Sequence, residues 1–399
     1  MQNVRQITEG VYWVGANDRR IERFENMFPL TNGVAYNAYL ILDEKTAILD
    51  TVDSSVSRQY LENVAYVLDG RPLDYLVINH MEPDHCANIE ELVRRYPGVR
   101  VIGNKKTFQF FQQYYDMDIS ENCMEVQEGQ EFSLGRHTLR FYMTPMVHWP
   151  EVMMTYETSH QMLFSADAFG AFGAHAGNLF ADELDFENLY LDETRRYYAN
   201  IVGRFGAQVQ AVLKKLSCVP VSIICPLHGP VWRANLWYLM EKYDKWSRYV
   251  PEQKGVVLFY ASMYGNTENA MLLLANKLAQ RGVTDMRTYD VSKAHASYII
   301  ADVWKYSHFV IGSPTYNMSL YYGMDALLHE LSALNLQNRS AAIIGNHTWA
   351  SAALKAMEER LAAMKNITVL GTLDIRSSLK GEQELDVLAD SIAASVLAP

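Results

Sequence analysis

Four side chains able to bind a metal ion lie within six consecutive residues of this chain. They are His80, Glu82, Asp84 and His85, and they follow residues 75–79, an apolar run typical of the end of a buried strand. A strand end is a rigid support, and loops that leave neighbouring strands gather at one edge of a sheet. The fold of this chain therefore has to bring further ligands to the edge where these four lie.

Three later segments repeat this arrangement. His148, Asp167 and His228 each follow an apolar, strand-like run, and a turn residue comes after each of them. With the first four residues they supply four imidazoles and three carboxylates, enough for two metal ions that share one carboxylate. If residues 80–85 are considered alone, they could instead form a polar loop between a strand and a helix. The presence of His148, Asp167 and His228 in the same kind of position argues against that alternative. We therefore predict a dinuclear metal centre with these seven residues as its ligands and catalytic groups.

The ligand types favour iron. Dinuclear zinc sites are rich in imidazole, whereas two carboxylates in the hexapeptide and a third at Asp167 make a harder, more anionic site. Such a site suits iron or manganese better than zinc, and iron is the metal that we predict.

A second informative region begins near residue 254. Residues 255–260 form a buried-strand run, residues 261–267 a loop with hydroxyl groups and glycine, and residues 268–280 a helical pattern that stops at Gly282. The helix N-terminus and the hydroxyls of Ser262 and Thr267 would surround a phosphate. The loop has no Lys or Arg and no GxGxxG pattern, which excludes the usual triphosphate and dinucleotide loops and leaves a monophosphate such as FMN. A plain strand–helix turn is the alternative.

Two later loops favour the FMN interpretation. Both follow strand-like runs and combine polar groups with an aromatic residue. In an open parallel sheet, ligands bind at the carboxyl ends of the strands, and aromatic side chains there can flank a flat ring. The predicted FMN-binding residues are Ser262, Met263, Tyr264, Gly265, Asn266, Thr267, Ser313, Pro314, Thr315, Tyr316, Asn317, Gly345, Asn346, His347, Thr348 and Trp349.

The order HxExDH, H, D, H resembles the metallo-β-lactamase-like domain of the flavodiiron proteins, a family of oxygen and nitric oxide reductases. Hydrolases of the wider superfamily usually carry His where this chain has Glu82. The resemblance implies two irons per chain, with Asp167 as the bridge between them. It assigns His80, Glu82 and His148 to one iron, and Asp84, His85 and His228 to the other.

The second half resembles flavodoxin. Five strand-like runs alternate with helices, at residues 256–260, 286–291, 308–312, 341–345 and 368–375. Tyr316 and Trp349 would then line the isoalloxazine. Many members have a glycine-rich stretch in the third loop where this chain has Asn346, His347 and Thr348. That departure concerns the details of the flavin contacts.

Together the resemblances imply an α/β fold in two domains. Residues 1–250 would form a metallo-β-lactamase-like αββα sandwich that holds the two irons, with a helical stretch over residues 193–216. Residues 254–399 would form a flavodoxin-like, doubly wound, five-stranded parallel sheet that binds FMN. Residues 249–255 would be the linker.

The resemblance also implies an activity and partners. Electrons would pass through FMN to the irons and reduce O2 to water, NO to N2O, or both. The four cysteines form no CxxC pair of the kind that a fused rubredoxin needs, so we expect the electrons to come from rubredoxin or a similar small carrier. Because the linker is short, a head-to-tail homodimer would place the flavin of one protomer against the iron site of the other.

Composition limits the remaining possibilities. With 399 residues, 49% of them hydrophobic, the chain can bury two cores. No run approaches the roughly 20 apolar residues of a membrane helix, and the first residues lack a signal-peptide core, so we expect a cytoplasmic protein without a membrane anchor. The formal charge of −11 argues against nucleic acid and against an acidic membrane surface as partners.

Two other functions remain open at this stage. A metallo-hydrolase with a fused flavodoxin would hold zinc and would cleave an ester or lactam without needing flavin. A flavodoxin-type electron carrier with a non-catalytic metal domain would accept electrons but consume no oxygen. The presence of Glu82, where hydrolases usually carry His, argues against the hydrolase. The complete set of seven metal-binding residues argues against a non-catalytic metal domain. The other histidines have no ligand-like spacing: His137, His160, His175, His295, His308, His329 and His347. We expect them to be structural, with His347 and His175 as the exceptions that their loops suggest.

Overall fold

The computed structural model describes residues 2–398 and divides into two compact units. The first unit extends to Tyr198 and resumes at Ala207–Tyr243, and the second contains Ala199–Gly206 and the chain from Asp244 onward. The outer limits of the predicted domains, residues 1 and 399, lie outside the described residues. The predicted boundary between residues 250 and 254 stays a prediction.

A seven-stranded sheet forms one half of the first unit. Its order is β1 (Arg5–Thr8), β2 (Val11–Trp13), β7 (Tyr39–Leu42), β8 (Thr46–Leu49), β9 (Tyr75–Val77), β10 (Arg100–Gly103) and β11 (Cys123–Glu125). The strands from β1 to β8 pair antiparallel, and those from β8 to β11 pair parallel. Parallel neighbours end at the same edge, so the loop after β9 leaves the sheet beside the loop after β8.

A five-stranded sheet forms the other half. Its order is β12 (Glu131–Ser133), β13 (Thr138–Met143), β14 (Met153–Glu157), β15 (Met162–Phe164) and β16 (Ile223–Cys225). All neighbours are antiparallel except β15 and β16, which run parallel. Consequently the loops after β13, β15 and β16 all leave from one edge of this sheet.

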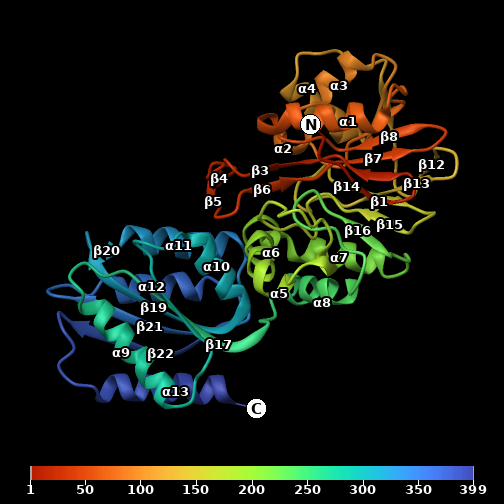
Figure 1. Ribbon diagram of the computed structural model, residues 1–399. Helices are drawn as coiled ribbons and strands as arrows, with labels where there is room; N and C mark the ends of the chain where they lie inside the picture. Colours follow the sequence, from red (N-terminus) through yellow and green to blue (C-terminus); the bar gives the residue numbers. More distant parts are fainter. Residues whose placement is uncertain (1, 399) are drawn as a thin grey trace. The chain divides into compact units, whose positions relative to one another are not determined.

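The two sheets stack face to face and share one core. Tyr39, Leu49 and Val77 from the first sheet pack in the same buried cluster as Phe141 and Phe164 from the second. Figure 1 shows the helices on the two outer sides of this pair of sheets. The helices beside the first sheet are α1 (Ser57–Leu68), α2 (Pro83–Cys86), α3 (Ile89–Arg95) and α4 (Lys105–Tyr114), and those beside the second are α5 (Phe186–Leu189), α6 (Leu191–Tyr197), α7 (Gly206–Leu216) and α8 (Leu236–Ser247). The predicted αββα sandwich is confirmed.

Two small hairpin-like pairs complete this unit and were not predicted. β3 (Ala16–Asp18) pairs with β6 (Val34–Tyr36), and β4 (Arg23–Phe24) pairs with β5 (Phe28–Pro29). Phe24, at the end of β4, packs edge-on against the ring of His228, with 5.1 Å between the ring centroids. The second pair therefore supplies an apolar wall beside one predicted ligand.

The second unit is an open parallel sheet. Its strands are β18 (Met286–Asp290), β17 (Gln253–Tyr260), β19 (Tyr306–Tyr316), β21 (Arg339–His347) and β22 (Ile367–Arg376), in that order, and all of these neighbours pair parallel. The two-residue strand β20 (Ser319–Leu320) pairs antiparallel with the end of β19. The first strand in the chain lies second in the sheet, which is the flavodoxin-like order, and the predicted five-stranded sheet is confirmed.

Helices cover both faces of this sheet (Figure 1). The helices α9 (Asn266–Gln280) and α13 (Gln383–Leu397) share a core with Val256 and Leu258 of β17. The helices of the opposite face are α10 (Ala296–Lys305), α11 (Tyr322–Ala333) and α12 (Ala353–Ala362). Because side chains alternate along a strand, Val257 and Phe259 are buried on that opposite face.

The predicted helical stretch over residues 193–216 is helical throughout, but it is not a single α-helix. After α6 the chain makes a π-helical turn, Tyr198–Val202, and a 3-10 turn, Gly203–Phe205, before α7 begins. A Cβ atom at Gly206 would lie 2.3 Å from the carbonyl oxygen of Ser247, so the backbone there needs glycine. The helical pattern in the sequence did not reveal this close approach of two backbones.

Within residues 2–398, none of the helices has both the length and the apolar character needed to span a bilayer.

Candidate metal centre and flavin pocket

The loop after β9 is fixed by buried hydrogen bonds before it reaches the ligands. The carboxylate of Asp50 accepts the backbone N–H of Asn79 at 2.7 Å and that of His80 at 3.2 Å, and it also accepts the Asn79 side-chain amide at 2.7 Å. Thr155 Oγ1 donates to Asn79 Oδ1 at 2.7 Å. These bonds tie the loop of the first sheet to β14 of the second, so the ligand positions depend on both sheets.

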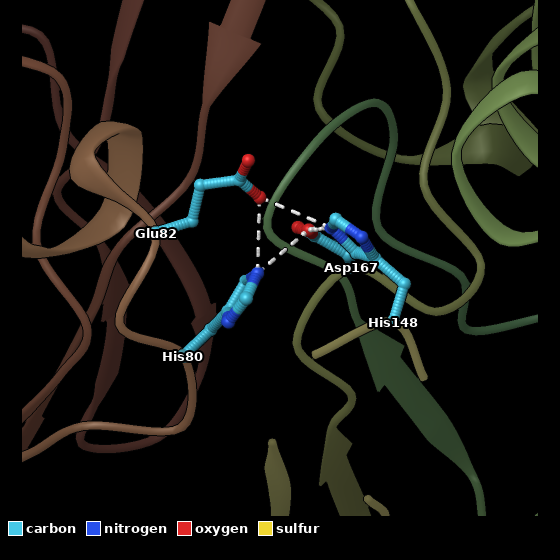
Figure 2. A group of neighbouring side chains, drawn as sticks. All are labelled: His80, Glu82, His148 and Asp167. Carbon is cyan, nitrogen blue, oxygen red and sulfur yellow. Dashed lines mark hydrogen bonds and ion pairs between the residues drawn. The ribbon is translucent and has the colours of Figure 1, made fainter. Parts of the chain in front are cut away.

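The first ligand group joins both halves of the sandwich. Glu82 Oε2 lies 3.1 Å from His80 Nε2 and 3.0 Å from His148 Nε2. Asp167 Oδ2 lies 3.3 Å from His80 Nε2 and 3.1 Å from His148 Nε2. Figure 2 shows these four side chains converging on one point. Ligand atoms about 2.0–2.2 Å from a metal ion lie about 3.0–3.5 Å from one another, and these distances match that spacing.

The second group has the same spacing. Asp84 Oδ2 lies 3.3 Å from His85 Nε2 and 3.2 Å from His228 Nε2. Asp167 Oδ1 lies 3.1 Å from His85 Nε2 and 3.6 Å from His228 Nε2, and the two imidazole nitrogens are 3.0 Å apart. All seven predicted ligands thus lie in two adjacent groups.

Asp167 belongs to both groups through different oxygens. Its side chain is 2% exposed, and its Oδ1 atom is buried without a hydrogen-bond partner among the described residues. Burial by itself raises the pKa of this carboxyl, but the imidazoles of His85 and His80 lower that pKa well below its usual value. Asp167 is a buried, ionised carboxylate that offers one oxygen to each of the two groups of metal-binding side chains. It therefore fits the role of a bridging metal ligand.

Hydrogen bonds orient two of the imidazoles toward the centre. His80 Nδ1 lies 2.7 Å from Glu151 Oε1, and His228 Nδ1 lies 2.9 Å from the carbonyl oxygen of Ala35. A carboxylate or carbonyl oxygen only accepts, so Nδ1 carries the hydrogen in each ring and Nε2 presents its lone pair to the site. Glu151, which is fully buried, also accepts the backbone N–H of Met81 at 2.9 Å. Glu151 was not predicted from the sequence, because nothing around it marks it as a partner of His80.

The site holds protons that a metal ion must displace. Burial disfavours the charged form of His148, yet hydrogen bonds with Asp167 and Glu82 raise the pKa of this ring to about 9. Imidazole binds metal only as the neutral ring, so metal uptake releases this proton.

Tyr197, which was also not predicted from the sequence, has its hydroxyl buried near Asp167 without a hydrogen-bond partner among residues 2–398. Burial and then the charge of Asp167 raise the pKa of Tyr197 well above its usual value, so the hydroxyl keeps its proton.

A cavity of about 330 Å³ lies at the carboxyl edge of the parallel sheet. Its lining includes eleven predicted residues: Ser262, Met263, Tyr264, Asn266, Thr267, Pro314, Thr315, Asn346, His347, Thr348 and Trp349. The predicted residues Gly265, Ser313, Tyr316, Asn317 and Gly345 do not line it. Ala350 and Ser377 do, and both were missed. Ser377 follows β22, so a fourth strand end contributes to the cavity.

The phosphate end of this cavity is built from hydroxyl and amide groups. Ser262 Oγ accepts the backbone N–H groups of Gly265 at 3.1 Å and Glu268 at 3.3 Å. The Asn346 side-chain amide donates to Thr267 Oγ1 at 3.3 Å and to the Ser377 carbonyl oxygen at 3.2 Å. The lining has no Lys or Arg, and α9 begins at this loop. A phosphate monoester fits such a neutral cradle at a helix N-terminus.

The rim of the cavity carries exposed rings. Trp349 is 86% exposed and Tyr264 is 88% exposed. Large aromatic side chains in such exposed positions are what a flat ring system would cover. The cavity therefore fits FMN at both its phosphate and its ring end.

Both halves of the chain match known domain families. Residues 34–229 match the model described as ODP family beta lactamase, and residues 258–389 match the flavodoxin model. Among solved structures, the rubredoxin oxygen:oxidoreductase of the anaerobe Desulfovibrio gigas aligns over 99% of both chains, with a TM-score of 0.92 and 28% identity. The flavodiiron protein of Giardia intestinalis aligns over 99% of this chain and 96% of its own, with a TM-score of 0.88 and 26% identity.

Sequence relatives cover almost the whole chain. A nitric oxide reductase of Moorella thermoacetica is 33% identical over 362 residues, which make up 90% of each protein. The chain belongs to the flavodiiron protein family. An anaerobic nitric oxide reductase flavorubredoxin of Vibrio vulnificus is 32% identical over 89% of this chain and 72% of its own length. As a member of the flavodiiron family the protein is an oxidoreductase, and its flavodoxin domain and its family imply FMN and iron.

Proposed function

We propose that this flavodiiron protein reduces NO to N2O, O2 to water, or both, at a site of two iron ions, with electrons that arrive through FMN from a small carrier. The observation that carries the proposal is the placement of Asp167, with Oδ2 in one ligand group and Oδ1 in the other. Two ions held by these groups would share this carboxylate, and such a two-metal site would let both ions act on one small molecule.

The donor set supports iron as the metal. The first group offers two imidazoles and Glu82, the second offers two imidazoles and Asp84, and both share Asp167. Three carboxylates make the site hard and anionic, and carboxylates serve both oxidation states of iron. The seven ligands leave positions open for a substrate.

The predicted FMN would deliver the electrons. When bound, FMN accepts two electrons and releases them singly, and two irons store two more. Ser262 and Thr267 would hold the phosphate, and Trp349 would cover the ring. Around the metals, Glu82 and His148 are largely buried and Asp167 is almost fully buried, so water has little access. Tyr197 holds a proton at its hydroxyl oxygen beside Asp167, and reduction of either substrate consumes protons.

The names of relatives support these two substrates. The proteins of Moorella thermoacetica and Vibrio vulnificus are named nitric oxide reductases, and that of Desulfovibrio gigas is named an oxygen oxidoreductase. The last name also includes rubredoxin. We therefore propose rubredoxin, or a similar small electron carrier, as the electron donor.

We further propose a head-to-tail homodimer, in which the FMN pocket of one protomer faces the metal centre of the other. Support comes from the surface around the pocket, where Met263 is 45% exposed in addition to Tyr264 and Trp349. Exposed apolar groups that gather at a functional site are often covered by a partner surface. The predicted linker at residues 249–255 is short, which supports the same arrangement.

The test is substrate consumption by the protein loaded with iron and FMN, with reduced rubredoxin as the donor. We expect rubredoxin oxidation to be coupled to uptake of O2, NO or both, and we expect uptake to stop when FMN is removed. Flavin reduction without any uptake would instead identify an electron carrier. Cleavage of an ester or lactam that continues without flavin would identify a hydrolase.

A further inference from the structure

A third group of metal-binding side chains lies in the first unit. His137 directly precedes β13, Glu157 ends β14, and His160 lies in the turn between β14 and β15. One ligand atom from each residue lies within 4.8 Å of those of the other two. Local sequence patterns do not mark this group, because antiparallel pairing of β13 with β14 is what brings residue 137 beside residue 157.

The distances within the group resemble those of the two groups described above. His137 Nδ1 lies 3.2 Å from Glu157 Oε1, and His160 Nδ1 lies 3.4 Å from Glu157 Oε2. Ligands about 2.0–2.2 Å from a tetrahedral metal ion are about 3.3–3.6 Å apart. Each imidazole therefore approaches one oxygen of the carboxylate at a separation that two ligands of one ion would have.

Both ring nitrogens that face the carboxylate are buried, and each makes only a long contact with one of its oxygens. Neither His137 Nδ1 nor His160 Nδ1 has a hydrogen-bond partner among the described residues. The side chains of His137 and Glu157 are 3% and 0% exposed. Buried polar atoms normally make a well-formed hydrogen bond, and contacts of 3.2 and 3.4 Å leave both nitrogens poorly satisfied. A cation between them would satisfy both.

The surrounding backbone holds the group in place. Glu157 Oε1 accepts the N–H of Ser159 at 2.7 Å, and Oε2 accepts the N–H of His160 at 2.8 Å, which fixes the carboxylate in the turn. Asp43 Oδ2 accepts the N–H of His137 at 2.6 Å. A Cβ atom at Gly10 would lie 3.1 Å from His137 Nε2, so the ring packs tightly against that turn and Nδ1 faces Glu157.

This group is separate from the two-metal centre. β13 begins next to His137 and leads toward His148, and β15 begins after His160 and leads toward Asp167. The third group thus lies at the opposite end of the same strands. The six residues of β13 extend over about 20 Å, so no ligand of one site can reach the other.

We propose that His137, Glu157 and His160 form a third metal site, which binds one zinc ion or a similar first-row divalent cation. The ligands are His137 Nδ1, His160 Nδ1 and a carboxylate oxygen of Glu157. Two imidazoles and one carboxylate suit zinc, with water as a fourth ligand. The His160 side chain is 30% exposed, which gives the ion a route of entry. The ion would join the two turns at this end of the sheet and stabilise the first unit.

The experiment uses the iron- and FMN-loaded protein. Zinc chloride is added, free zinc is removed by gel filtration, and zinc, iron and FMN are measured in the protein. We expect about one additional zinc per chain with iron unchanged, a higher unfolding temperature for the first unit, and a loss of zinc affinity of more than about tenfold in His160→Ala. His329→Ala, at an exposed histidine of α11, is the matched control and should bind zinc like the wild type.

A second measurement does not depend on a variant. Crystals of the wild-type protein soaked in zinc should show an anomalous peak at the zinc edge between the imidazoles of His137 and His160. Zinc that binds equally to His160→Ala and the wild type, zinc found only at the two-metal centre or on the surface, or no additional zinc at all would each overturn the proposal.

Discussion

At the scale of single residues, the geometry of the metal centre depends on groups that do not touch the metal. Glu151 is the clearest case, because it holds His80 through Nδ1 and also accepts the Met81 N–H. The carboxylate makes the facing Nε2 atom more basic and sets the orientation of the ring. Asp50 acts one step further away, by fixing the backbone of Asn79 and His80.

Replacing Glu151 with Gln should weaken the centre without unloading the flavin. Gln has the same shape but is neutral, so the His80 Nδ1 hydrogen bond loses its charged acceptor. We expect iron affinity or turnover to fall by about 10- to 100-fold. Iron content, FMN content and turnover would be measured on the same preparation. The exposed Glu121→Gln serves as the control. Wild-type iron affinity and turnover in the Glu151 variant would mean that His80 is held in some other way.

At the scale of elements, four strand ends of the second unit build the flavin pocket, and the first loop carries the hydroxyls. Replacing Ser262 and Thr267 together with Ala removes two neutral hydrogen bonds to the phosphate, each contributing about 1 kcal/mol. We expect FMN affinity to fall by roughly tenfold or more, while iron content stays unchanged. The dissociation constant comes from fluorescence titration of the flavin-free protein, and the exposed Thr284→Ala is the control. Undiminished flavin binding would place the phosphate elsewhere.

The start of β19 gives the second unit a predictable pH dependence. His308 is buried between Ser307 Oγ at 2.7 Å and Ser395 Oγ at 2.9 Å, and burial, followed by the charge of Lys254, lowers the pKa of its ring to about 4. In the unfolded chain the ring takes up a proton near pH 6.5. Below that pH the unfolded state binds more protons, so the free energy of unfolding decreases from about pH 6.5 to pH 4 and is unaffected by this group above pH 6.5.

His308→Gln should remove that part of the pH dependence. Denaturant unfolding of the second unit at pH 7.5 and pH 5 should differ less in the variant, by on the order of 1 kcal/mol after allowance for solvent screening. His329→Gln, at an exposed position, should behave like the wild type. An unchanged difference between the two pH values would show that His308 titrates normally in the folded protein.

The sequence predicted the elements whose pattern is local. Each of His80, His148, Asp167 and His228 follows an apolar strand, and the structure brings all four to one place. Each strand of the parallel sheet also has its own apolar run, and these runs alternate with helices in the pattern that resembles flavodoxin. These features depend on neighbouring residues in the chain, which a sequence displays directly.

The features that were missed depend on contacts between distant residues. Glu151 lies 71 residues from His80, and nothing around it marks it as a partner. Ser377 reaches the flavin pocket because β22 pairs with β21, and its own sequence reads as a simple turn. The close approach of Gly206 and Ser247, at the start of α7, is a further contact of this kind. Only the folded chain shows such contacts.

At the scale of the whole molecule, the proposed dimer makes each active site from two protomers. A metal-deficient variant, Asp167→Ala, and the flavin-deficient Ser262/Thr267 double variant should therefore complement each other when their subunits exchange. A mixed dimer contains one site with both intact halves. We expect part of the wild-type turnover to return on mixing. Mixed dimers that form and stay as inactive as either parent, or an active monomer, would contradict transfer between protomers.

We propose that the active protein holds two irons that share Asp167. The most direct measurement is iron-edge X-ray absorption on anaerobically purified protein whose NO and O2 turnover has been determined on the same sample. We predict about two irons per chain, with an iron neighbour about 3.5–4 Å from each iron, and loss of that neighbour in Asp167→Asn. Active protein that contains two tightly held zinc ions, or isolated irons without a metal neighbour, would contradict it.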